Sequence, residues 1–123
     1  NIPVIGAESN EVPKVYLLIT LEGGDLLIAD QIKKAGLPQL TAFMLNEGTE
    51  NYSTEEISSM LDDLGSSIQF NSNSRTSTIF ITSLVGNLDK TIDILKEKLF
   101  MPGFDEEDFK RLWCGSGKYQ FWR

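Results

Sequence analysis

The alternation of apolar and polar residues near the N-terminus predicts two β-strands. The runs are Ile2–Ala7 and Lys14–Glu22, and polar residues separate them. The longer run, Lys14–Glu22, is rich in β-branched and aromatic residues. In Lys14–Glu22 both faces of the alternation are mostly apolar, which predicts a central strand with one face well covered. The pair Gly23–Gly24 ends this strand, and the following segment, Asp25–Lys34, is compatible with either a loop or a short helical turn.

Two helices are predicted next. Residues 36–47 carry an apolar stripe at helical spacing, and Gly48 stands where a left-handed C-terminal cap is expected. The stretch "STEEISSMLDDLG" predicts the clearest helix of the chain, because Ser53 can cap it and Glu56 can close a capping box. The apolar face of this second helix comprises Ile57, Met60, Leu61 and Leu64.

The second half of the chain repeats the order of strands followed by helices. A β-hairpin is expected with its turn inside Asn71–Arg75, and Ile79 and Ile81 then point to the same face. Asn87 is expected to cap a helix that Pro102–Gly103 ends, and a last helix begins near Asp105. The apolar face expected for the capped helix is Leu88, Ile92, Leu95 and Leu99.

The predicted order is therefore β-β-α-α-β-β-α-α. Adjacent strand pairs and adjacent helix pairs indicate an α+β fold, with an antiparallel-rich sheet and helices packed on one of its faces. A length of 123 residues fits a single domain spanning 1–123. The last residues, 113–123, have no evident periodic or capping pattern and are treated as an atypical tail.

Composition and charge exclude several function classes. The net charge is −7 and no cluster of basic residues offsets it, so we expect no nucleic-acid partner. The apolar runs are far shorter than the roughly 20 residues that a membrane span needs, so no membrane insertion is expected. The chain has no histidine and a single cysteine, Cys114, which excludes an intrachain disulfide and an imidazole or thiolate cluster for zinc.

Three polar stretches could suggest other sites, and each has a simpler interpretation. The acidic run Asp105–Phe109 could hold a hard cation, but acids in a first helical turn are commonly solvated and favoured by the helix dipole. The segment Asn71–Thr78 could bind a ligand or form a polar hairpin turn. The stretch Leu21–Asp25 lacks the lysine and the length of a phosphate-binding loop, which favours a turn.

Taken in order, these segments resemble the insulinase/pitrilysin-like zinc peptidases, which include the mitochondrial processing peptidases and their bacterial relatives. Catalytic members of that family carry G-L-A-H-x-x-E-H-M-x-F-x-G-T, an inverted zincin motif. The corresponding segment here is "GLPQLTAFMLNEGT", and Gly36, Leu37, Met44, Gly48 and Thr49 match the motif. Residues 53–70 and 73–112 are similar to later segments of the family, and the resemblance implies a LuxS/metallopeptidase-like fold.

The metal-binding positions depart from this motif. Gln39 and Phe43 stand at the two histidine positions, and Ala42 stands at the position of the glutamate that activates water. The resemblance also places the third zinc ligand, a glutamate, near Lys118–Gln120, where no acid occurs. Hydrolysis at zinc needs three fixed ligands, an open position for water and a general base. We therefore predict no catalytic and no metal-binding residue in this chain, and no activity of the isolated chain. An amphipathic helix that never bound metal is the alternative for Gln39, Ala42 and Phe43.

The resemblance implies a non-catalytic domain, or part of a non-catalytic half, of a zinc peptidase. Its implied role is to shape a closed chamber and help bind a peptide substrate for a homologous catalytic half or subunit, which would hold the zinc. An assembly subunit like the family's respiratory-complex core proteins is the alternative. A stand-alone enzyme with other chemistry is a third hypothesis, which the residue inventory disfavours. Bacterial relatives with this pattern suggest a periplasmic location, with the cytoplasm or an organellar matrix as alternatives.

Overall fold

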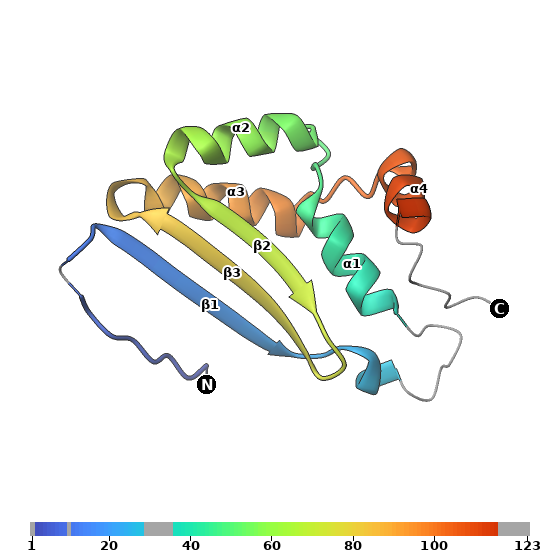
Figure 1. Cartoon of the computed structure of the whole chain (residues 1–123), viewed down its shortest axis with the longest axis horizontal. Helices are drawn as coiled ribbons and strands as arrows, with labels where there is room; N and C mark the ends of the chain where they lie inside the picture. Colours follow the sequence, from blue (N-terminus) through green and yellow to red (C-terminus); the bar gives the residue numbers. More distant parts are fainter. Residues whose placement is uncertain (1, 10, 29–35, 116–123) are drawn as a thin grey trace.

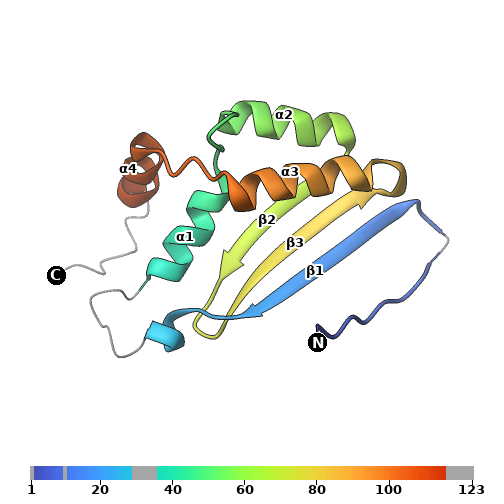
Figure 2. The same cartoon turned by 180° about the vertical axis from the view of Figure 1, so that it is seen from behind.

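The structure, a computed structural model, describes residues 2–9, 11–28 and 36–115. A three-stranded sheet carries helices on one face (Figures 1 and 2). Its strands are β1 (Lys14–Glu22), β2 (Ser67–Ser72) and β3 (Thr76–Leu84), in the spatial order β1-β3-β2. Both neighbouring pairs are antiparallel. The helices are α1 (Leu37–Asn46), α2 (Thr54–Leu64), α3 (Leu88–Phe100) and α4 (Glu106–Gly115), with 3-10 turns η1 (Asp25–Ile28) and η3 (Val85–Asn87).

The α+β class, the antiparallel sheet and its one helical face are confirmed, but the predicted first strand is not formed. Residues 2–9 make no strand, and Ile2, Val4 and Ile5 are almost fully exposed. A strand requires a hydrogen-bonded neighbour, and among the described residues β1 pairs only with β3. The described order is therefore β-α-α-β-β-α-α.

The prediction that Lys14–Glu22 is a central strand is wrong within the described chain. β1 lies at an edge of the sheet, on the side away from the helices (Figures 1 and 2). Most of its side chains are exposed, although Leu17 packs against the core. The described part of the chain therefore does not cover both apolar faces of β1.

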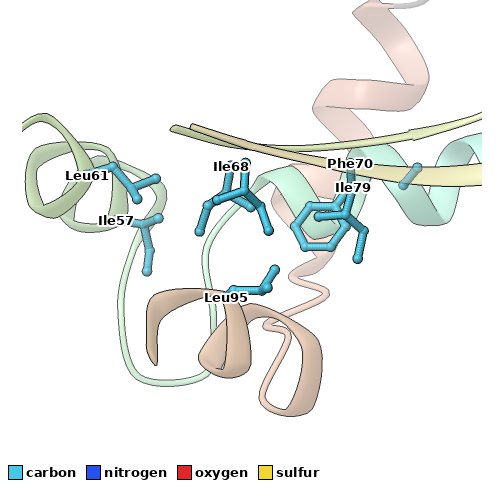
Figure 3. Packing of buried hydrophobic residues seen from close by; sticks show 8 residues of the cluster. Ile57, Leu61, Ile68, Phe70, Ile79 and Leu95 are labelled. Atoms are coloured by element: carbon cyan, nitrogen blue, oxygen red, sulfur yellow. The ribbon is translucent and has the colours of Figure 1, made fainter. Parts of the chain in front are cut away.

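The core lies between the inner face of the sheet and the helices α2 and α3. Figure 3 shows Ile68, Phe70 and Ile79 projecting from the strands toward Leu95 on α3, with Ile57 and Leu61 of α2 at one side. Ile81 is completely buried, and its neighbour in the sequence, Phe80, is exposed on the opposite face of the sheet, as the alternation predicts. The registers place Leu17, Ile81 and Ile68 opposite one another across the three strands.

The helix caps show which local sequence signals predicted the observed structure correctly. The capping box of α2 is formed: Ser53 Oγ accepts from Glu56 N and Glu56 Oε2 accepts from Ser53 N. Gly65 ends α2 in the left-handed conformation. Gly48, by contrast, does not adopt the predicted left-handed conformation. It is needed for close approach, because a Cβ there would lie 2.8 Å from the carbonyl oxygen of Tyr52.

Two details of α3 differ from the prediction. The Asn87 side chain does not cap the helix; its Nδ2 donates to Leu64 O at the end of α2. The buried face is also rotated, so that Thr91, Leu95 and Lys98 are buried while Leu99 is partly exposed. The hydrogen bond to a backbone carbonyl 23 residues away in the sequence orients the Asn87 side chain, and its oxygen makes no cap hydrogen bond.

Polar side chains inside the fold satisfy one another. The hydroxyls of Ser66, Ser83 and Thr91 form a triangle with oxygen–oxygen distances of 3.1, 2.7 and 3.0 Å. Asn46 pairs with the backbone of Phe70 on β2: its Nδ2 donates to Phe70 O at 2.9 Å, and its Oδ1 accepts from Phe70 N at 2.8 Å. The carboxamide thus joins the C-terminal end of α1 to the outer edge of β2.

Candidate functional site

Helix α1 carries all three positions at which a metal motif was expected. Gln39 and Phe43 are four residues apart and therefore lie on the same side of the helix. Pro38 occupies the first turn, where its missing N–H costs nothing. The helical backbone thus places Gln39 and Phe43 at the spacing of two metal ligands. Whether a metal can bind there depends on the side chains.

Gln39 is engaged in a structural link to the turn η1. Its Nε2 donates to Asp25 Oδ2 at 2.7 Å, and Gly36 N donates to Asp25 Oδ1 at 2.9 Å. Gly36, the residue before α1, has a positive φ and no capping side chain of its own. The carboxylate of Asp25, 11 residues upstream, therefore anchors the start of α1, and Gln39 completes that anchor.

Ala42 belongs to the hydrophobic core, and the next residue, Phe43, is half-buried. A carboxylate at the Ala42 position would enter an apolar environment without a partner, which is costly. The expectation that Phe43 fills the space of a former metal site stays a prediction.

These residues do not fit the zinc that the family's motif implies. Gln39 offers one neutral amide oxygen, Oε1, which is buried and has no hydrogen-bond partner among the described residues. Zinc sites use imidazole, thiolate or carboxylate ligands, usually three or four of them. Within residues 2–9, 11–28 and 36–115, no group of three or more His, Cys, Asp or Glu residues could hold a metal ion. The Lys118–Gln120 region, where the third ligand was expected, lies outside the described residues.

The C-terminal end of α1 is held by a buried lysine that the sequence interpretation missed. Lys98 Nζ donates to the carbonyl oxygens of Leu45, Asn46 and Glu47 at 3.1, 3.0 and 2.8 Å. The side chain is 2% exposed. Burial lowers the pKa of Lys98 to about 8, and the Glu47 carboxylate partly opposes this shift. The signal that could have found it is its position, seven residues after Thr91 on the buried face of α3.

An open cleft rich in acidic residues lies beside this helix end. Its volume is about 830 Å³, and it is lined by residues of the loop after α1, the start of α2 and the start of α4. Arg111 crosses it, with NH2 2.7 Å from Glu47 Oε2 and 2.8 Å from Asp108 Oδ1. These hydrogen bonds, first to Asp108 and then to Glu47, raise the pKa of Arg111. The cleft carries Glu47, Glu50, Glu55, Asp105, Glu107 and Asp108, so its potential favours cations.

The other polar stretches adopt the simpler of their two interpretations. Asp105 Oδ1 accepts from Glu107 N, so the acidic run forms the first turn of α4. Asn73 Oδ1 accepts from the backbone N–H groups of Arg75 and Thr76 and thereby shapes the hairpin turn. Gly24 adopts a positive φ next to that turn, where a Cβ would meet the carbonyl oxygen of Asn73. α4 extends to Gly115, and the remainder of the tail lies outside the described residues.

The Asp25–Gln39 link gives a test of the structural role of Gln39. In a double-mutant cycle with Asp25→Ala and Gln39→Ala, we expect a coupling of about 1 kcal/mol in the free energy of unfolding, because the two side chains share one partly buried hydrogen bond. Urea denaturation of the four proteins measures it. A matched cycle with Asp25→Ala and Thr41→Ala, an exposed residue of the same helix, should be additive within about 0.5 kcal/mol. Additivity in both cycles would refute the proposed link.

Comparison with known proteins gives two concordant results. The sequence profile of the family described as Insulinase (Peptidase family M16) matches residues 4–114. The chain is similar in structure to a peptidase M16 inactive domain from Pseudomonas fluorescens, with a TM-score of 0.71 and 19% identity over 85% of this chain and 25% of that one. It is also similar to a protease from Helicobacter pylori, with a TM-score of 0.68 and 16% identity over 83% of this chain and 26% of that one. No curated protein sequence matched.

The chain thus spans about a quarter of the length of the solved structures that it resembles. At these identities the two structures support the fold, which agrees in its α+β layers with the one described above. Among the described residues, none of the helices has the length and apolar content required to cross a membrane. Because the family profile covers most of the sequence, this chain belongs to the insulinase family of peptidases, family M16.

Proposed function

We propose that this chain is a non-catalytic domain of an M16 peptidase, which shapes the substrate chamber for a catalytic half located elsewhere. The observation that carries the proposal is the state of helix α1. The helix is retained, while Gln39 bonds to Asp25 and Ala42 is buried in the core. The positions that bind metal and activate water in the family's motif are thus used for folding.

The comparison with Pseudomonas fluorescens supports the proposal, because that structure is described as an inactive domain. In the proposed arrangement, the catalytic half supplies the three zinc ligands and the general base. This chain contributes a wall of the chamber and contacts to an extended peptide. A periplasmic location is part of the proposal and is tested separately, by fractionating cells that express the full-length protein.

The first experiment is a zinc titration of the purified chain by calorimetry. We expect no stoichiometric site tighter than roughly micromolar, because imidazole and paired thiolates are both lacking. The double variant Gln39→His/Phe43→His is the positive control. It places two imidazoles one helical turn apart, and we expect it to bind zinc at roughly micromolar affinity. A tight site in the unaltered chain would overturn the proposal.

The second experiment separates a supporting domain from an assembly subunit. A polypeptide of the same genome that carries H-x-x-E-H is expressed with and without this chain, and cleavage of a fluorogenic peptide is measured. We expect turnover to require both, and none by this chain alone with or without added zinc. Full turnover in the absence of this chain, or its co-purification with a membrane respiratory complex, would contradict the proposed function.

A further inference from the structure

We draw no further inference here: the strongest candidate, the acidic cleft between the starts of α2 and α4 at the C-terminal end of α1, is a cluster of carboxylates, and nothing in the described residues besides their charge points to a ligand.

Discussion

Replacing Lys98 with methionine is expected to lower the free energy of unfolding by about 3 kcal/mol at pH 7. The ammonium group donates to three carbonyl oxygens at the end of α1, and these are orphan acceptors of the helix. Methionine fills similar volume but donates nothing, so the carbonyls are left buried and unpaired. Urea denaturation measures the loss, and Lys96→Met, which removes only an exposed ion pair with Asp93, should cost less than about 0.5 kcal/mol.

The same lysine predicts a specific dependence of stability on pH. The pKa of Lys98 is about 8 in the folded protein and 10.5 as its ordinary value. Between these pH values the unfolded chain binds more protons, so the contribution of Lys98 to the free energy of unfolding rises with pH. That contribution is fully present above pH 10.5 and is lost as the pH falls through about 8.

The difference in stability between the unaltered chain and Lys98→Met should therefore grow from pH 8 to pH 10.5. Titrations of all other groups cancel in this difference. A constant difference across the window would show that the lysine is not desolvated in the folded protein.

Replacing Ile81 with alanine is expected to lower the free energy of unfolding by about 4 kcal/mol. Ile81 has no exposed surface and lies at the centre of the sheet, between Leu17 on β1 and Ile68 on β2. Truncation removes buried methyl groups and leaves a cavity that neighbouring strands cannot close.

Phe80→Ala is the control for Ile81, because the two residues are adjacent on β3 and point to opposite faces. Phe80 is 40% exposed, and its truncation should cost about 1 kcal/mol. Thermal and urea denaturation of both variants check that Ile81→Ala loses more stability than Phe80→Ala. Equal losses would mean that the outer face of the sheet is as well covered as the core.

The elements that depend on neighbouring residues could be predicted from the sequence. The capping box of Ser53 and Glu56 and the alternation of Ile79, Phe80 and Ile81 are local patterns, and the structure contains all of them. The departure from the metal motif at Gln39 was also evident, because it depends on residue identity alone.

Features that depend on distant residues could not be predicted. Lys98 bonds to carbonyls more than 50 residues away, and Gln39 bonds to a carboxylate across the loop before α1. Gly48 is a local exception: it matched a capping pattern but is required by the close approach of the Tyr52 carbonyl in the turn between α1 and α2. β1 looked central because its residues are apolar on both faces, and sequence does not say which neighbour provides the cover.

The pairing of Asn46 with Phe70 determines how far the sheet can propagate. One carboxamide occupies both the donor and the acceptor of a residue on the outer edge of β2, as a peptide group of a further strand would. Strand addition at the outer edge of β2 is thereby blocked at this residue. The blocked margin protects β2 from pairing with a strand of another molecule, which is how sheets elongate into fibrils.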